Sequence, residues 1–318
     1  MKACVLKKNG RIEVEEKSIP QIRENEVLIK ISVCGVCHSE LEEYISGSSD
    51  DHTVLGHEPV GVVEKTGNMV QNFKPGDRVT GIFSHGFAEY AAAGEETLIK
   101  VPPHLRDEEA IIEPWSCLMS GLDRANIKIG DTAAVVGCGY MGLGDLMLAK
   151  LCGVSKMIAV DIRQPSLESA KEFGADECWL SQEVPEKYIV DKWDGCIFEK
   201  GVDVVFEATG TEAGLELAGK MVKPHGTLVI VGYHNSGEKR RIDMKLWNWK
   251  AITVINAHER RAEQQVRYAK KAMDLIAAGK VEAGRLITHC YTPENINQGF
   301  QDLKERPENY IKGFVRMG

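Results

Sequence analysis

Three short segments in the first 115 residues combine side-chain types that bind metals. Cys34-Gly35-Val36-Cys37-His38-Ser39-Glu40 carries two thiols and an imidazole, Gly56-His57-Glu58-Pro59 follows about twenty residues later, and Ile112-Glu113-Pro114 is a turn that bears a carboxylate. Zinc prefers thiolate and imidazole ligands, and a carboxylate can complete its coordination. Three protein ligands would leave one position open for water or an alcohol, which is the arrangement of a catalytic zinc site.

Two other readings of these cysteines carry less weight. A redox pair at Cys34 and Cys37 would need a thioredoxin-like βαβ pattern, which does not surround them. A closed structural zinc site would need a second cysteine cluster, and nine scattered cysteines do not suggest a disulfide framework. We interpret Cys34 and the remaining cysteines as core or surface thiols: Cys4, Cys117, Cys138, Cys152, Cys178, Cys196 and Cys290.

A second chemical signal is a glycine-rich turn behind an apolar strand. Ala133–Val136 runs into Gly137-Cys138-Gly139-Tyr140-Met141-Gly142, and a helical pattern follows. In this G-x-G-x-x-G arrangement the glycines allow a tight turn, close approach of a pyrophosphate, and close packing of helix on strand. Free N–H groups and the dipole at the helix N-terminus favour phosphates. The segment therefore predicts a dinucleotide site.

An acidic residue supports this prediction and suggests which dinucleotide binds. The next strand, Met157–Val160, ends in Asp161, about twenty residues beyond the glycines, where a carboxylate can accept both ribose hydroxyls. Asp161 would repel a 2′-phosphate, so NAD is favoured over NADP. Arg163 either softens this preference or is a solvated surface charge.

Two kinds of element must position these groups. Residues 1–100 form short β segments broken by turns, often at glycine, which predicts a small barrel or sandwich. From about Ser116, apolar strands alternate with helical patterns, which predicts a doubly wound parallel sheet. The expected strands there are Ala133–Val136, Met157–Val160, Val202–Glu207, Thr227–Val231 and Ile252–Asn256, and the expected helices are Gly139–Leu151, Ser166–Phe173 and Ala213–Lys223.

After Ala257 a different pattern begins. A long helix is expected at Glu259–Ala278 and a second from Thr292, with strands near Leu286–His289 and Gly313–Met317. We expect the chain to return to the first domain there. The last strand of the parallel sheet, Ile252–Asn256, could pair with a second copy across a two-fold axis.

Composition narrows the class of protein. The chain has 318 residues, 43% hydrophobic and 27% charged, with a net charge of −8 and no long run of one sign. Binding to nucleic acid is not expected, because it rests on a basic patch. No apolar stretch is long enough for a membrane span, and the first residues do not resemble a secretion signal. These features favour a cytoplasmic protein with neither a membrane nor a nucleic-acid partner.

Taken in order, these motifs resemble the zinc-dependent medium-chain dehydrogenase/reductase family, which includes alcohol and polyol dehydrogenases. The resemblance covers nearly the whole chain. The motifs that carry it are Cys37-His38-Ser39, Gly56-His57-Glu58, Gly76-Asp77-Arg78-Val79, Glu113-Pro114, Gly137–Gly142, Asp161 and Glu207-Ala208-Thr209-Gly210. It implies a GroES-like β-rich catalytic domain, residues 1–115 and 258–318, and a Rossmann NAD-binding domain, residues 116–257.

The resemblance also assigns roles. Cys37 and His57 match the zinc ligands, and Glu58 matches a glutamate that ligates zinc or exchanges with water. Glu113 stands where sorbitol-type enzymes have a glutamate, so the chain is similar to the polyol and secondary-alcohol branch. Ser39 matches the hydroxyl that passes the substrate proton towards solvent. The implied cofactor-binding residues are Gly137, Gly139, Tyr140, Met141, Gly142, Asp161, Arg163, Thr209 and Gly210.

The sequence departs from the family pattern in three places. Only a short link joins Val79 to Phe87, so the lobe that binds a structural zinc is missing and one catalytic zinc per chain is expected. Glu40 replaces the usual aspartate, and Glu42 stands near the place of a relay histidine. Substrate-pocket candidates are Tyr44, His85 and Phe87.

We therefore expect a dehydrogenase that transfers a hydride between a secondary alcohol or polyol, or the corresponding ketone, and NAD(H). The resemblance implies a homodimer or homotetramer. The alternatives are a threonine-type amino-alcohol dehydrogenase, an enzyme that works mainly as a reductase, and a non-catalytic NAD-binding sensor. The set of Cys37, His57 and Glu113 argues against the sensor, because binding NAD alone needs no open metal site.

Overall fold

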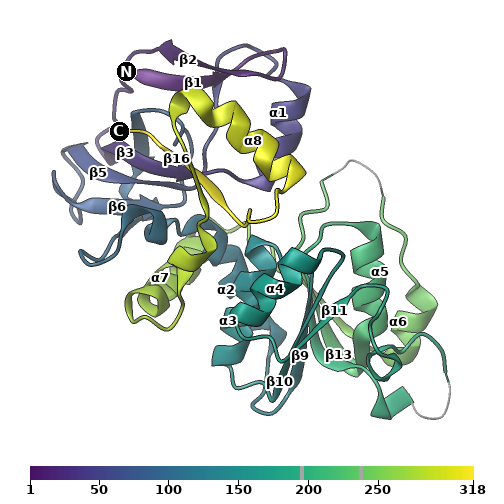
Figure 1. The fold of residues 1–318 in the computed structure, drawn as a ribbon. Coiled ribbons are helices and arrows are strands. Elements are labelled where there is room, and N and C mark those ends of the chain that lie inside the picture. The colour runs from purple at the N-terminus through teal and green to yellow at the C-terminus, as the bar shows by residue number, and fades with distance from the viewer. Residues whose placement is uncertain (194–196, 236–238) are drawn as a thin grey trace. The chain divides into compact units, whose positions relative to one another are not determined.

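The computed structural model describes residues 1–193, 197–235 and 239–318, so Cys196 lies outside the described residues. The described chain divides into two compact units (Figure 1). The first unit is Met1–Ser116 with Glu259–Gly318, and the second unit is Cys117–His258. Within the described residues, no helix is both long and apolar enough to cross a membrane.

The first unit is built mainly of β-strands, as the sequence predicts. Its larger sheet has the order β15-β16-β3-β5-β6-β8, with β7 also paired to β3, and its smaller sheet has the order β2-β1-β4. The strands are β1 (Lys2–Leu6), β2 (Ile12–Glu16), β3 (Glu26–Gly35), β4 (Thr53–Val54), β5 (Pro59–Thr66), β6 (Arg78–Gly81), β7 (Tyr90–Gly94), β8 (Leu98–Lys100), β15 (His289–Tyr291) and β16 (Gly313–Arg316).

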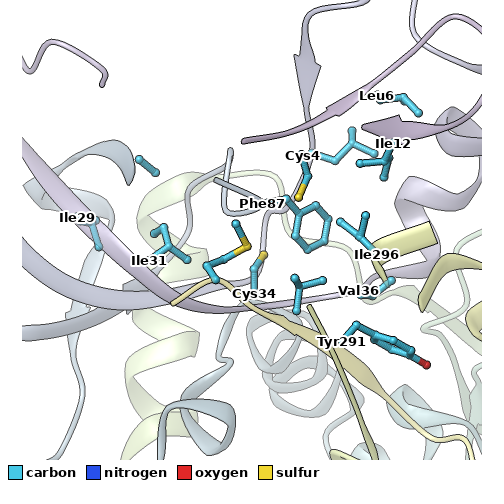
Figure 2. Close-up of a cluster of buried hydrophobic side chains, with 14 of the residues drawn as sticks. Cys4, Leu6, Ile12, Ile29, Ile31, Cys34, Val36, Phe87, Tyr291 and Ile296 are labelled. Atoms are coloured by element: carbon cyan, nitrogen blue, oxygen red, sulfur yellow. The ribbon is translucent and has the colours of Figure 1, made fainter. Parts of the chain in front are cut away.

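Strand β3 organises this unit, because it pairs antiparallel with β5, β7 and β16. Its apolar residues Val27, Ile29 and Ile31 are buried in one core cluster, which also contains Cys34 and Phe87 (Figure 2). Apolar side chains removed from water in this way supply the main stabilisation of the sheet. The helices of the unit are α1 (Leu41–Ser46), α7 (Ala262–Ala277) and α8 (Ile296–Glu305).

The second unit contains the predicted doubly wound sheet. Its strands are all parallel and lie in the order β11-β10-β9-β12-β13-β14. They are β9 (Thr132–Val136), β10 (Lys156–Asp161), β11 (Glu177–Leu180), β12 (Val202–Glu207), β13 (Val222–Ile230) and β14 (Thr253–Asn256). Helices α3 (Tyr140–Leu151) and α4 (Gln164–Glu172) contact mainly β9, β10 and β11, and α3 also reaches β12. Helices α5 (Glu212–Met221) and α6 (Met244–Lys250) contact mainly β12 and β13, and α5 also reaches β9. The fold is therefore a GroES-like, β-rich unit combined with a Rossmann sheet, as expected.

Several local predictions were wrong. Glu113 is the first residue of helix α2 (Glu113–Ala125) and not part of a turn, because Pro114 has the fixed φ that suits a first helical turn. The helix expected at Ala213–Lys223 ends at Met221, since β-branched Val222 and then Pro224 favour the strand that follows directly. A strand was expected at Leu286–His289, but Leu286 is the last residue of a 3₁₀ helix. Strand β15 starts only at His289.

Asp145 is an unexpected polar side chain inside helix α3. It is fully buried, and neither carboxylate oxygen has a hydrogen-bond partner among the described residues. Burial raises the pKa of Asp145 well above its usual range. The folded protein therefore keeps this carboxyl group protonated at neutral pH, because the charged form would be desolvated and unpaired.

Asp145→Asn is expected to increase the free energy of unfolding at pH 8 by about 1 kcal/mol or more, and to leave it unchanged near pH 4. The unfolded chain releases this proton above about pH 3.9 whereas the folded chain retains it, so wild-type stability falls as the pH rises. Asparagine has no proton to lose. Urea unfolding at both pH values measures the difference, with exposed Asp274→Asn on α7 as the control. Equal stabilities of wild type and Asp145→Asn at pH 8 would contradict a neutral, buried carboxyl group.

Candidate active site

The metal-binding residue types of the first unit lie at the ends of two neighbouring strands. Strand β3 ends at Gly35, two residues before Cys37, and His57 and Glu58 directly precede β5. The two strands pair antiparallel, so the end of one lies beside the start of the other. The backbone N–H of Gly35 donates to the carbonyl of Glu58 at 3.1 Å, which fixes the two segments together.

The donor atoms of Cys37, His57 and Glu58 all lie within 4.8 Å of one another. The Ser39 hydroxyl is exposed, donates to the Cys37 Sγ at 3.3 Å and lies 3.4 Å from His57 Nε2. A carboxylate oxygen of Glu113 is 3.9 Å from the same His57 nitrogen. Four side chains from three separate segments of the chain thus meet at one place: a thiol, an imidazole and two carboxylates. This donor set suits zinc.

Glu40 orients His57. Its Oε1 accepts hydrogen bonds from His57 Nδ1 at 2.8 Å and from the Gly56 N–H at 2.7 Å. In the neutral form of His57 this network places the proton on Nδ1, so that the Nε2 lone pair would face Cys37 and Glu113 once a metal ion displaces the second proton. Glutamate is longer than the aspartate usual at this position, but the Glu40 carboxylate still contacts His57 Nδ1. Histidines that bind metals usually have such a carboxylate partner on their second ring nitrogen.

Glu40→Ala is expected to weaken metal binding and kcat/KM about 10–100-fold, the usual effect of losing such a supporting carboxylate. Glu40→Asp should recover part of the loss if the shorter side chain still reaches Nδ1. Zinc affinity in a chelator competition and steady-state rates measure the effect, and the exposed Glu42→Ala is the matched control. If Glu40→Ala bound zinc as tightly as the control, Glu40 would not orient His57.

Glu58 is held from behind by Lys312, which directly precedes β16. The Lys312 Nζ donates to Glu58 Oε1 at 2.7 Å and lies 2.6 Å from Oε2, and both side chains are buried. Glu40 Oε2 is also buried, and it accepts no hydrogen bond from the described residues. This buried acceptor atom is thus left unsatisfied at the site, which is what a site built to hold a cation would show.

The electrostatics also favour a cation. Burial raises the pKa of Glu113 to about 7, and neighbouring His57 opposes that rise. Burial by itself lowers the pKa of His57, yet hydrogen bonds to Cys37 and Glu40 outweigh it and raise that pKa to about 12. The groups around His57 therefore stabilise a positive charge, which a metal ion would supply. Metal and protons then compete for these residues.

Cys34 differs from Cys37 in its surroundings. It is fully buried in the core cluster, where Figure 2 shows it among apolar side chains, and burial raises the pKa of its thiol well above the usual range. Cys37 is only partly buried. The structure therefore separates a core thiol from a thiol at the site. None of the other described cysteines forms a disulfide, and Cys290 is exposed.

The glycine-rich turn of the second unit has the geometry of a phosphate-binding loop. Gly137 has a φ of 98°, which favours glycine, and a Cβ at Gly142 would lie 1.9 Å from the Gly137 carbonyl oxygen. Gly139 is the N-cap of helix α3, and no side chain caps it. The unfilled helix N-terminus therefore leaves N–H groups for an anion. Next to it, Tyr140 is buried and Met141 is half-buried.

Asp161 is fixed beside this turn. Its Oδ2 accepts from the Cys138 N–H at 2.7 Å, and its Oδ1 accepts from the Arg163 N–H at 2.9 Å. The carboxylate thus stands at the carboxyl end of β10, the edge where open parallel sheets bind ligands. The next residue, Ile162, is 78% exposed, which sequence reasoning missed. The sequence did contain a signal for this exposed residue, because Ile162 directly follows the acidic residue that ends β10. An exposed apolar side chain at that place offers a surface against which a flat ring of a ligand can pack.

The three pocket candidates lie in different surroundings. Phe87 is fully buried and meets Phe300 edge to face, with ring centroids 6.1 Å apart. Tyr44 stacks on the same Phe300 ring, and its hydroxyl donates to Asn297 at 3.2 Å. His85 is exposed and has a φ of 68°. Phe87 therefore belongs to the core, Tyr44 is half-buried against Phe300, and His85 is the most exposed of the three.

Comparisons with known proteins agree with this description. The zinc-binding dehydrogenase family matches residues 141–278, and the alcohol dehydrogenase GroES-like domain matches residues 23–103. D-xylulose reductase of Saccharomyces cerevisiae is 28% identical, with 98% of this chain and 97% of the relative aligned. Sorbitol dehydrogenase of Bacillus subtilis is 29% identical, with 96% and 93% aligned. The crystal structure of 2R,3R-butanediol dehydrogenase from Bacillus subtilis superposes with a TM-score of 0.84 at 26% identity, covering 100% of this chain and 99% of that one. The chain therefore belongs to the zinc-binding medium-chain dehydrogenase family.

Proposed function

We propose that this protein is a zinc-dependent dehydrogenase that transfers a hydride between a secondary alcohol or polyol, or the corresponding ketone, and NAD(H). The observation that carries the proposal is the meeting of Cys37, His57 and two glutamates at one place in the first unit. The sorbitol, xylulose and butanediol enzymes among its relatives support the substrate class. In this proposal the first unit is the catalytic domain and the second unit binds NAD.

Cys37, His57 and Glu113 are proposed to hold the metal. Glu58 has the distances of a ligand, but the buried Lys312 ammonium lies 2.6 Å from its Oε2 and offsets its charge directly, whereas Lys312 acts on Glu113 through a coulombic attraction. A zinc ion bound there would supply positive charge that lowers the pKa of a coordinated hydroxyl group. Glu113→Gln should then lose zinc, and Glu58→Gln should retain most of it. Metal content of the two purified variants distinguishes these ligand sets.

Ser39 is proposed to accept the substrate proton. Its hydroxyl is exposed and lies beside the Cys37 Sγ and His57 Nε2, so it can take a proton at the site and release it to water. Asp161 is proposed to accept the ribose hydroxyls of the cofactor, while the turn from Gly137 to Gly142 approaches its pyrophosphate. NAD, when bound, accepts the hydride.

Asp161→Ser is expected to raise the KM for NAD about 10–100-fold, because it removes hydrogen bonds to a charged group, and to lower the KM for NADP. The preference arises because a carboxylate repels a 2′-phosphate. Initial rates with both cofactors measure the change, and the exposed Glu172→Ser on α4 is the control. An unaltered ratio of NAD to NADP efficiency in Asp161→Ser would show that another residue selects the cofactor.

The proposal includes an assembly of identical chains. Strand β14 pairs with β13 on one side, and its residues Thr253, Val254 and Asn256 are exposed. An unpaired strand edge is able to continue its sheet in a second copy. We expect a homodimer or homotetramer, which sedimentation at several concentrations would measure.

The whole proposal is tested with the purified protein. Zinc content is measured with and without a chelator, and NADH formation is followed by absorbance with polyols, simple secondary alcohols and threonine as substrates. Zinc-dependent turnover of one polyol or secondary alcohol class is expected. Turnover of threonine alone would identify an amino-alcohol dehydrogenase. Tight NADH binding without turnover of any alcohol or reduction of any ketone would indicate a sensor.

A further inference from the structure

Glu207 is a buried hub at the carboxyl end of strand β12. Its side chain is fully buried. One oxygen, Oε1, accepts from the Thr209 N–H at 2.7 Å, the Thr209 hydroxyl at 2.5 Å and the Gly210 N–H at 2.9 Å. The other, Oε2, lies 2.9 Å from His234 Nε2. The carboxylate therefore fixes the turn after β12 and also reaches the loop after β13.

His234 and Arg240 close this network into a ring. The Arg240 Nε donates to His234 Nδ1 at 3.1 Å, and the Arg240 Nη2 donates to the Gly210 carbonyl at 3.4 Å. Because Nδ1 accepts from a guanidinium, the proton of a neutral His234 is on Nε2 and is donated to Glu207. The ring thus runs from Glu207 through His234 and Arg240 back to Gly210, and it joins two loops at one edge of the sheet.

The loops in this ring also touch the glycine-rich turn. A Cβ at Gly210 would lie 2.8 Å from the Tyr233 carbonyl oxygen, and one at Gly232 would lie 2.3 Å from the Gly210 nitrogen. A Cβ at Gly137 would lie 2.8 Å from the Thr209 Cγ2. The loops after β9, β12 and β13 are therefore packed with no space between them. A displacement of the Thr209–Gly210 turn would move the surface beside the phosphate-binding loop.

We propose that His234 and Arg240 are positioning residues, which hold the Thr209–Gly210 turn in the shape that binds the nicotinamide dinucleotide. The ring acts through Glu207, and neither residue needs to touch the cofactor. Open parallel sheets bind dinucleotides at the edge where these loops lie. The two residues follow β13 and lie outside the glycine-rich motif, so the motif alone would not reveal them. This inference rests on the proposed NAD-dependent function.

Two variants and a conservative rescue test the proposal. His234→Ala removes both ring contacts, Arg240→Met removes the closing contact, and His234→Gln keeps an amide that can donate to Glu207 and accept from Arg240. Arg241→Met is the matched control, because Arg241 is an exposed neighbour that binds Glu212 outside the ring. The first measurement is hydrogen exchange of the peptide that covers residues 207–211, without any cofactor.

We expect exchange at the Thr209 and Gly210 amides to accelerate about tenfold or more in His234→Ala and Arg240→Met, but not in Arg241→Met. The dissociation constant for NADH, followed by fluorescence, should rise about tenfold, and the KM for NAD should rise more than kcat falls. His234→Gln should restore most of the slow amide exchange and most of the NADH affinity. Melting curves establish that each variant is folded.

The outcomes separate the two proposals. Unchanged exchange and unchanged NADH affinity in folded His234→Ala would overturn the positioning role, whatever the enzyme's substrate. Faster exchange with unchanged NADH affinity would also overturn it, since the ring would then stabilise the loop without serving the cofactor. Wild-type protein that binds no NADH at all would overturn the proposed function itself.

Discussion

Cys37→Ala is expected to lower kcat/KM about 10³-fold or more and to release zinc from the purified protein. The thiolate is the softest donor of the candidate site, and no second thiol belongs to this cluster in the described part of the chain, because Cys34 lies in the apolar core. A metal ion contributes several kcal/mol of charge stabilisation to the reaction, and each 1.36 kcal/mol corresponds to a factor of ten.

Steady-state rates and metal content measured on the same sample test this expectation. Cys290→Ala is the matched control, since this thiol is exposed and belongs to the same unit. The control should retain full activity and one zinc. A Cys37→Ala variant that kept both zinc and more than about a tenth of the activity would contradict the assigned site, because it would leave the metal without its thiolate.

Lys312→Met is expected to reduce the free energy of unfolding by about 3–5 kcal/mol. The variant would leave the Glu58 carboxylate buried without its counter-charge, and such a charge is costly in an interior. The intact pair contributes little net stability. The attraction between the two buried charges only slightly exceeds the hydration free energy that they lose on burial. The large effect therefore comes from breaking the pair and not from the strength of the pair.

A double variant makes this reasoning testable. Glu58→Gln combined with Lys312→Met removes both charges and should recover most of the loss in a urea unfolding experiment. Lys304→Met on the exposed side of α8 is the control and should shift the free energy by no more than about 0.5 kcal/mol. If the double variant were as unstable as Lys312→Met alone, packing around the lysine stem would be the cause, and the charge argument would fail.

The candidate ligand residues could be proposed from the sequence because ligand chemistry is a property of residue type. Cys37 and His57 carry the donor atoms that zinc prefers, and their positions at the ends of strands follow from apolar patterns. The turn from Gly137 to Gly142 was predictable for a similar reason, since only glycine tolerates its geometry. Local sequence was therefore enough to name the candidate groups of both sites.

The partners of these groups were not predictable, because they come from distant parts of the chain. Lys312 stands 254 positions after Glu58, and no local pattern links a lysine to a buried carboxylate so far away. His234 reaches Glu207 only because parallel strands place successive loops side by side. The start of α2 at Glu113 was also missed, since Pro114 both interrupts strands and opens helices.

The separation between Glu58 and Lys312 also affects how the chain folds during synthesis. At about 5–20 residues per second, a ribosome needs roughly 13–50 s to add the residues between them, and the whole second unit is made in that interval. The parallel sheet of the second unit can fold before Lys312 has been synthesised, when Glu58 still has no counter-charge. Until then Glu58 has to remain hydrated or protonated, so the first unit should be exposed to chaperones and proteases for longer than the unit inserted within it.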